Sequence, residues 1–370
     1  MGTALGAMTA AEYILRPVFQ DCPEMAPRPA KVLIALCIIL LLVLANCYDT
    51  RLGSALQVAS TVCKLSALAV IIIVGIGFIA RGDTENLQNP FSFEEEPRLD
   101  RVIFAVYACT YAYVGWDSLC MAVEEIKNPN RNIPLAILLG ILVVMVCYLL
   151  ANLAYVTVLT TGQIVSSVAV AVGFCKMSIP SLVWFIVPCI GISATGVVNV
   201  MIFSSSRINF VGGRDNLFPE VLSMVSVSRR TPLVSYLVLG LLAGVVVLVG
   251  DISSVLGAYS LIRASGETVA ILGIFRLRKK FPATATTYVV PTIAPVTYLI
   301  LHLTLLAVSL TRDLPRYAVA LPLCLLGLPV YYMSSTPIFR VGPLKAFNDV
   351  AVKLSRRLLL CDFASKNYEN

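Results

Sequence analysis

An acidic residue beside a glycine, inside an otherwise apolar segment, is the position in this chain best suited to chemistry. Asp117 follows the pair Gly115 and Trp116 in the stretch TYAYVGWDSLC. A glycine in the middle of such a helix weakens it, and the interruption frees backbone amides and carbonyls to bind a small ligand. We expect a broken helix with a ligand site at Asp117. The alternative is a kinked helix in which Asp117 pairs with Lys64 or with a hydroxyl group.

An arginine and a glutamate four residues apart form a second candidate. Arg263 and Glu267 fall on one face of a helix in GAYSLIRASGETVAIL, so the two side chains could neutralise each other. Alternatively, the planar guanidinium of Arg263 would suit a substrate carboxylate. The sequence leaves both interpretations open.

Three further charges lie in or beside apolar segments. Lys64 is near the middle of its segment and is expected to face the protein interior, where it would cap the carbonyls of a neighbouring helix or contact a ligand. Glu124 and Glu125 follow the expected break, and Lys127 and Arg131 are close enough in sequence to pair with them. We interpret these two acids as gate or loop charges rather than substrate ligands.

The segments that carry these residues are predicted to be membrane-spanning helices. Hydrophobic residues make up 58% of the chain and charged residues only 13%, which is typical of an integral membrane protein. A helix needs about 20 mainly apolar residues to cross a bilayer. Continuous apolar runs predict an all-α polytopic membrane protein rather than a β-barrel, whose strands would show short alternating segments. The ten predicted spans are residues 3–19, 32–48, 55–80, 101–123, 134–159, 181–204, 233–250, 253–275, 290–311 and 317–334.

Basic residues in the loops predict how these spans are oriented. The larger share of the 28 Lys and Arg residues falls in the loops after even-numbered spans and in the segment after the tenth. The positive-inside rule then places both termini in the cytoplasm, with a transmembrane domain over residues 1–335 and a cytoplasmic tail over 336–370. This asymmetry accounts for the net charge of +7, so the lipid bilayer and not a nucleic acid is the expected partner.

Cys22 differs from most of the 11 cysteines, which lie in apolar runs and are expected to behave as small hydrophobic residues. It lies in RPVFQDCPEMAPRPAK, a polar, proline-rich loop that is predicted to be extracellular. No obvious loop partner faces the same oxidising compartment. Cys22 could therefore form an intermolecular disulfide or be a free surface thiol.

The first residues of the chain read as the middle of a helix. The stretch MGTALGAMTAAEYILRPVF has no basic region and no cleavage site, so it does not predict a signal peptide. Either translation begins abruptly at a span, or the chain is an N-terminally truncated fragment. We expect the second.

The motifs of the common catalytic classes are missing from the sequence. The chain has a single histidine, no metal-ligand spacing, no G-x-S-x-G and no phosphate-binding glycine loop, so we predict neither an enzyme nor a metal or cofactor. Charges inside spans, together with a broken helix, favour a transporter with a site near the middle of the bilayer over a channel or a receptor.

Several long motifs resemble the L-type amino acid transporter light chains, in the amino acid, polyamine and organocation superfamily. YAYVGWDSLCMAVEEIKNPNRNIPLAI is similar to the sixth helix and following loop of that family. Further similarities follow in order along nearly the whole chain, in AAEYILRPVFQDCPE, ALQVASTVCKLSALAVIIIVGI, SSSRINFVGGRDNLFPEVLSM and LGLPVYYM. The resemblance implies a LeuT-type inverted-repeat bundle, N-terminally truncated so that the ten predicted helices are its third to twelfth.

The resemblance also implies roles for particular positions. Cys22 occupies the place of the cysteine that bonds a single-pass glycoprotein heavy chain. Lys64 matches a lysine in a sodium-site-like position, which implies sodium-independent exchange. Tyr111 aligns with an aromatic gate over the substrate, and Ser193 with the polar part of the eighth helix. The implied substrate-binding or gating residues are Tyr111, Val114, Gly115, Trp116, Asp117, Ser193 and Arg263.

Positions that distinguish substrate types within the family disagree. Arg263 is similar to an arginine that faces an anionic side chain in the cystine/glutamate exchanger, but Glu267 departs from that pattern and could occupy the arginine. Asp117 in GWD resembles light chains for cationic and neutral amino acids, whereas Val114 replaces an acid of the basic-amino-acid exchangers. The resemblance therefore implies an amino acid substrate, whether neutral, cationic or anionic.

The expected function is transmembrane amino acid transport by obligatory exchange and alternating access, as the light chain of a disulfide-linked heterodimer in the plasma membrane. The resemblance places the family's first helix, with its glycine-rich substrate-binding break, outside this chain. The alternative is a truncated, transport-incompetent isoform or gene-model fragment that at most competes for the heavy chain.

Overall fold

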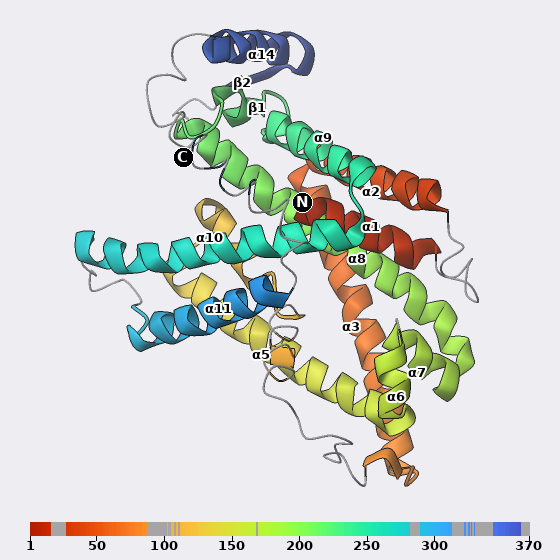
Figure 1. Ribbon diagram of the computed structural model, residues 1–370. Helices are drawn as coiled ribbons and strands as arrows, with labels where there is room; N and C mark the ends of the chain where they lie inside the picture. Colours follow the sequence, from red (N-terminus) through yellow and green to blue (C-terminus); the bar gives the residue numbers. More distant parts are fainter. Residues whose placement is uncertain are drawn as a thin grey trace.

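The computed structural model describes residues 1–15, 27–83, 85–87, 112–167, 169–281, 289–312 and 343–363, with isolated positions between 102 and 109 and between 322 and 329. Within these residues the chain is almost entirely helical, which confirms the predicted all-α class (Figure 1). Cys22 and Tyr111 lie outside the described residues. So do the predicted spans 101–123 and 317–334, except for isolated positions and the end of the first after residue 111.

In the described part of the chain, five helices are long and apolar enough to cross a membrane. They coincide with five predicted spans, so the chain is a multi-pass membrane protein. The two shorter helices α9 and α11 match the predicted spans 233–250 and 290–311, and α1 covers the described part of the first span. These helices are α1 (Gly2–Leu15), α2 (Arg28–Tyr48), α3 (Thr50–Ala80), α5 (Pro129–Val158), α8 (Val183–Arg214), α9 (Leu233–Val249), α10 (Ile252–Lys280) and α11 (Ile293–Arg312).

Polar residues and prolines between the apolar runs set the helix boundaries. Asp49, in an extended conformation, ends α2 and begins α3, where its carboxylate accepts a 2.8 Å hydrogen bond from the Arg51 amide. Asp251 caps α10 in the same way, at 3.1 Å from the Ser254 amide. At the start of α5, Pro129 occupies the first turn, where a missing amide hydrogen costs no helical hydrogen bond.

Helix α8 lies at the centre of the fold and contributes to two hydrophobic cores. One core is formed with α1, α2 and α9, and contains the fully buried Val198 and Ile202 of α8. The second is formed with α3, α5 and the short helix α7 (Val170–Ser178), and contains the fully buried Ile186 of α8 and Phe174 of α7. Figure 1 shows α8 crossing the molecule diagonally between these two groups of helices.

Small residues let these helices approach closely. Ala4, Ala7 and Ala10 form a fully buried face of α1, which packs against α8 in the first core. On α8, a side chain at Gly196 would overlap the Ser60 hydroxyl of α3. The absence of a side chain at Gly196 therefore allows α8 and α3 to pack closely at this contact.

Two peripheral units complete the described fold. Helix α10 contacts α1 and pairs with α11, and the pair projects from the rest of the molecule (Figure 1). At the other unit, the tail residues form α14 (Pro343–Leu359) and β2 (Cys361–Phe363). Strand β2 pairs antiparallel with β1 (Met224–Ser226), with Val225 opposite Asp362. The remaining short elements are η2 (Glu85–Leu87), η3 (Trp116–Glu125), α6 (Thr161–Ser166), η4 (Pro180–Leu182) and η5 (Glu220–Ser223).

Candidate functional site

The break expected beside Asp117 is present. Gly115 adopts a left-handed conformation with φ 115° and ψ −10°, and the 3-10 helix η3 starts directly after it. Residues 113–115 form a turn, and the Ser118 amide donates to the Gly115 carbonyl at 3.1 Å. A 3-10 helix of 10 residues is unusually long, and such stretches mark hinges and strained segments. The sequence places this irregular backbone where a continuous helix would otherwise run.

Asp117 meets Arg263 across the fold. Asp117 Oδ2 lies 3.2 Å from Arg263 Nη2, which joins the start of η3 to the middle of α10. Arg263 Nε lies 2.7 Å from Glu267 Oε1 on the next turn, so the internal pair, one of the two interpretations left open by the sequence, is present. The expected alternative partner of Asp117, Lys64, makes no ion pair within the described residues. One guanidinium therefore bridges two carboxylates.

Aromatic groups of α10 and α11 complete this cluster. The Tyr259 hydroxyl lies 3.4 Å from Arg263 Nη1, and the Tyr298 hydroxyl donates to Glu267 at 3.3 Å. His302 stacks on the Tyr298 ring at a centroid distance of 5.6 Å, and its Nε2 lies 3.1 Å from the Ala264 carbonyl. The same Nε2 also lies 3.7 Å from Glu267 Oε2, so His302 packs at the edge of the cluster.

The charge of the cluster is negative when His302 is neutral, because two carboxylates face one guanidinium. The Asp117 and Glu267 side chains are each 25% exposed, and the Arg263 side chain is 21% exposed. Asp117 Oδ1 is buried and accepts no hydrogen bond from the residues that the structure describes. A buried carboxylate oxygen without a donor is costly, so this oxygen is available to a ligand that brings a donor or a positive charge.

The other predicted site residues make no ion pair or hydrogen bond with the cluster around Arg263 in the described part of the chain. Val114 is half-buried and Trp116 is 44% exposed, beside the break. Ser193 is half-buried in α8, and its carbonyl lies 3.5 Å from the Ser60 hydroxyl of α3. Lys64 is exposed to solvent on α3 and forms no ion pair with a described residue, so its expected contact with the interior stays a prediction. The structure thus brings together Asp117 with Arg263, but does not place Ser193 or Lys64 in contact with them.

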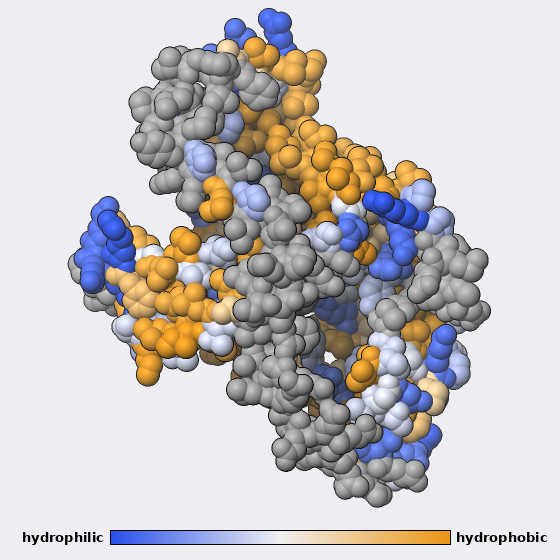
Figure 2. All heavy atoms as spheres, in the orientation of Figure 1, coloured by the Kyte–Doolittle hydropathy of each residue, from blue (hydrophilic) through white to orange (hydrophobic). Residues whose placement is uncertain are grey.

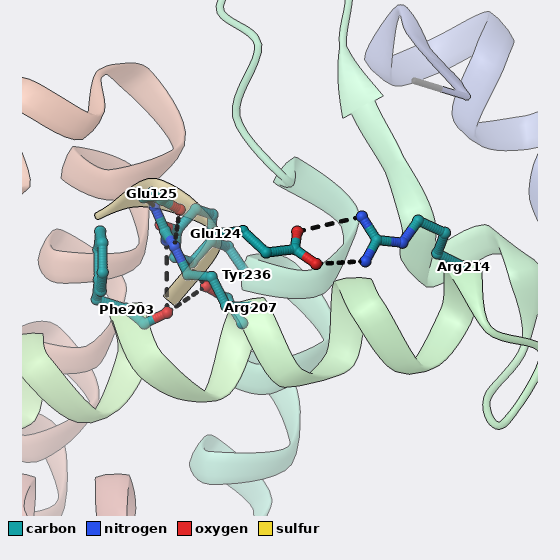
Figure 3. Close-up of polar contacts among 7 residues, drawn as sticks. Glu124, Glu125, Phe203, Arg207, Arg214 and Tyr236 are labelled. Atoms are coloured by element: carbon teal, nitrogen blue, oxygen red, sulfur yellow. Dashed lines mark hydrogen bonds and ion pairs between the residues drawn. The ribbon is translucent and has the colours of Figure 1, made fainter. Parts of the chain in front are cut away.

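A second polar contact fixes the far end of η3 to α8 (Figure 3). Arg207 Nε lies 2.8 Å from Glu125 Oε1, and Arg207 also donates to the Tyr236 hydroxyl of α9 and, at 3.4 Å, to the Phe203 carbonyl. Its guanidinium carbon lies 3.3 Å from the centroid of the Phe203 ring, a cation–π contact. The Arg207 side chain is only 10% exposed. A charge this buried is tolerated because its donors are satisfied.

The neighbouring acid forms a parallel but exposed contact. Glu124 binds Arg214 through two hydrogen bonds of 2.6 and 3.2 Å, two turns further along α8 (Figure 3). Hydrogen bonding to Arg214 lowers the pKa of the Glu124 carboxyl. The contact therefore stabilises the fold above the ordinary pKa of a glutamate and is lost as the pH falls through the lowered pKa. Pairing of these acids with Lys127 and Arg131, which we considered from the sequence, is not observed in the described residues.

The sequence did not reveal Arg207 and Tyr236 as partners of this segment. Arg207 lies beyond the predicted end of its span, at residue 204, and counted only as a loop charge. The structure extends α8 to Arg214, which brings both arginines onto the helix. The one sequence feature that could have indicated a buried Arg207 is its place at the end of SSSR, where small residues allow close helix packing.

Gly115 provides a direct test of the break. Alanine there has open space but must adopt a left-handed backbone, which costs about 1–2 kcal/mol. We expect Gly115→Ala to lower the rate of any transport that needs this backbone by roughly 5- to 30-fold. The matched control is Gly140→Ala in α5, where a side chain also meets nothing within 4 Å and the helical backbone favours alanine. Uptake assays that show equal rates for the two variants would contradict a role for the break.

No group of three or more His, Cys, Asp or Glu side chains in the described ranges is arranged to hold a metal ion. The cluster at Arg263 instead offers ion-pairing and hydrogen-bonding groups to an organic ligand. Such an arrangement can bind and release a charged or polar molecule, and it contains no paired nucleophile and base.

Comparison with known proteins gives consistent matches along the chain. The profile of the amino acid permease family matches residues 1–329. The chain is 32% identical to the human (Homo sapiens) cystine/glutamate transporter over 333 residues, which are 90% of this chain and 66% of that protein. It is 33% identical to the large neutral amino acids transporter small subunit 2 of Mus musculus over 356 residues, 95% of this chain and 66% of that protein.

A third relative is the Asc-type amino acid transporter 1 of Mus musculus, with 32% identity over 332 residues, 89% of this chain and 62% of that protein. The chain therefore spans somewhat less than two thirds of the length of these relatives. The similarity extends through η3, α8 and α10, which carry both polar contacts.

Proposed function

Because the chain belongs to the amino acid permease family, a family of membrane transporters and not of enzymes, we propose that it exchanges amino acids across the membrane. In this proposal it is the light chain of a heteromeric transporter in the plasma membrane. The relatives named above are themselves described as amino acid transporters, one of them as a small subunit.

The observation that carries this proposal is the break at Gly115 beside the Asp117 carboxylate. An amino acid has an ammonium group, a carboxylate and a variable side chain, so its site needs both acceptors and donors within an apolar protein. Asp117 Oδ1 is a buried acceptor without a donor among the described residues, and the left-handed Gly115 interrupts the regular backbone next to it. Broken helices of this kind supply backbone groups to substrates in membrane transporters.

The two ends of η3 support a mechanism of alternating access. Gly115 is a hinge at one end, and Glu125 and Glu124 hold the other end to Arg207 and Arg214 of α8. In the proposed cycle these ion pairs close the path on one side and open when η3 moves away from α8. With both termini cytoplasmic, as the basic residues predict, this would be the cytoplasmic side.

The contacts of Arg263 favour neutral or cationic amino acids as substrates. Asp117 and Glu267 both occupy its guanidinium, so an anionic side chain would have to displace one of them. The net negative charge of the cluster would repel that anion and attract an ammonium group. Asp117 therefore acts as the acceptor in this proposal, and Arg263 holds the two acids in place.

Uptake of labelled leucine, lysine, glutamate and cystine tests this proposal in cells that also express a single-pass glycoprotein heavy chain. We expect uptake of leucine and lysine, with little uptake of glutamate or cystine, and equal rates in sodium and choline buffers. Sodium independence would support the role implied for Lys64. Surface expression without uptake of any of the four would favour a chain that only competes for the heavy chain.

The heavy-chain partnership rests on Cys22, which we propose as the site of an intermolecular disulfide. On a non-reducing gel, the wild-type chain beside a heavy chain should migrate as a heterodimer, and reductant should separate it. Cys22→Ser should migrate as the monomer. The exposed Cys37 offers a control, because Cys37→Ser should leave the heterodimer band unchanged. Identical migration of wild type and Cys22→Ser would show that Cys22 forms no such bond.

A further inference from the structure

Helix α14 forms most of the described part of the tail, and one of its faces packs on the helical bundle. Ser355 is buried, and Ala351, Val352 and Leu359 pack against the hydrophobic cluster formed by η5, β1 and the start of α9. Asn348 accepts a 3.2 Å hydrogen bond from the Val221 amide of η5. Strand β2 continues the attachment by pairing with β1. The tail is therefore held at the end of the bundle where α8 ends and α9 begins.

A second face of α14 is apolar and exposed. Val350, Leu354 and Leu358 are 64%, 55% and 71% exposed, and their spacing of four residues places them on one stripe of the helix. Exposed leucines on a water-facing helix would be costly, and such a stripe marks a contact surface. Nothing in the described chain covers it.

The residues beside this stripe are basic. Lys353 and Arg357 are exposed and make no ion pair with a described residue, whereas Arg356 lies 2.9 Å from Asp362. An apolar stripe flanked by exposed lysine and arginine is the composition of helices that lie in the interface of a membrane. Anionic headgroups would complement the two unpaired charges.

The position of α14 in the fold also indicates contact with the membrane. Helix α9, whose first turns belong to the same hydrophobic cluster as α14, exposes Leu241, Leu242 and Val245 further along, as expected of a helix that faces lipid. In Figure 2 hydrophobic side chains continue from α14 onto α9 along the upper right of the molecule. The hydrophobic surface around α14 is thus continuous with that of α9 on this side of the molecule.

From these observations we propose that α14 lies in the membrane interface, with Val350, Leu354 and Leu358 among the acyl chains and Lys353 and Arg357 on anionic phospholipid headgroups. The tail would then be a lipid-binding element that anchors β2, β1 and η5 to one leaflet. Because η5 follows α8 directly, the lipid composition of that leaflet would bias the position of the α8 end that carries Arg207 and Arg214.

Fluorescence quenching by brominated lipids tests this contact in the full chain. The chain has two tryptophans, so the signal added by Leu354→Trp is the difference from the parent protein in the same nanodiscs. With lipids brominated near the top of the acyl chain, we expect most of the added fluorescence to be lost. The control is Asp349→Trp, an exposed position on the polar side of the same helix, which should keep most of its added fluorescence.

The headgroup preference is tested with the same variants. Quenching at position 354 should be stronger when the brominated lipid is phosphatidylserine than when it is phosphatidylcholine. High salt, or the double variant Lys353→Gln and Arg357→Gln, should abolish that difference. Leu358→Trp serves in place of Leu354→Trp if the latter does not elute as a single folded species. Equal quenching at 349 and at the stripe position, or none at either, would overturn the proposal and leave the stripe to a protein partner.

Discussion

Replacing Arg263 with alanine is expected to destabilise the membrane domain by about 3–5 kcal/mol, because two carboxylates would lose their shared cation in a largely buried site. Asp117 and Glu267 are each 25% exposed, so water compensates only in part for the lost partner. Unfolding in mixed micelles, followed by circular dichroism, would measure the change in the free energy of unfolding. Uptake by the variant should fall with the amount of folded protein at the cell surface.

The control for this prediction removes all three charges together. Arg263→Gln combined with Asp117→Asn and Glu267→Gln leaves hydrogen-bonding groups but no uncompensated charge, and should recover most of the lost stability. Its uptake should remain low, because the acceptor at Asp117 would be gone. If Arg263→Ala kept full stability and altered only the uptake of glutamate or cystine, Arg263 would be a substrate ligand and our assignment would be wrong.

Replacing Arg207 with alanine is expected to cost about 2–3 kcal/mol, because the Glu125 ion pair and the hydrogen bond to the Tyr236 hydroxyl are lost together. Glu125 is 52% exposed and can be hydrated afterwards, which keeps the cost below that at Arg263. In the proposed cycle, η3 would then leave α8 more readily, so the variant should favour the state that is open on that side. Because Cys120 in η3 is already exposed, a longer distance between spin labels at Cys120 and at Ile208→Cys in α8 would report this opening.

Arg214→Ala is the matched control for this second prediction. Arg214 pairs with Glu124 as Arg207 pairs with Glu125. Here, however, both side chains are exposed, Arg214 at 44% and Glu124 at 62%. Exposed pairs contribute about 0.2–1 kcal/mol, so the variant should unfold nearly as the wild type does. Equal losses of stability for Arg207→Ala and Arg214→Ala would show that burial does not distinguish the two contacts.

The apolar pattern was sufficient to predict the fold class and the approximate helix boundaries. Long apolar runs separated by Asp49, by Pro129 or by Asp251 can hardly form anything but helices, because the backbone must satisfy its own hydrogen bonds in lipid. The break at Gly115 was predictable for a similar local reason, since glycine is the residue that adopts a left-handed backbone without strain. Helical spacing made the pair of Arg263 with Glu267 possible, and the structure selects it over an Arg263 that faces a substrate carboxylate.

Contacts between distant segments could not be predicted in this way. We considered Lys64 as the partner of Asp117, and Lys127 and Arg131 as partners of the two glutamates, because opposite charges attract wherever they meet. Which charges meet depends on how the helices cross. In the structure, Asp117 forms its ion pair with Arg263 instead. Lys64 is exposed on α3, because the rotation of that helix is set by its packing on α5 and α8.

The tail illustrates the same limit. A cytoplasmic tail after residue 335 was predicted from its charge and polarity, but the pairing of β2 with β1 joins segments far apart in the sequence. Three-residue strands have no periodic signal that could indicate such pairing. The helical stripe of α14, in contrast, is visible in the sequence once the helix is known.

Counterflow in proteoliposomes tests the proposed exchange most directly. Purified protein, together with its heavy chain, would be reconstituted in liposomes that are either empty or loaded with unlabelled leucine. We predict that labelled leucine enters loaded liposomes much faster than empty ones, and that Gly115→Ala reduces this difference while Gly140→Ala does not. Equal entry into loaded and empty liposomes by folded wild-type protein would contradict exchange through the broken segment.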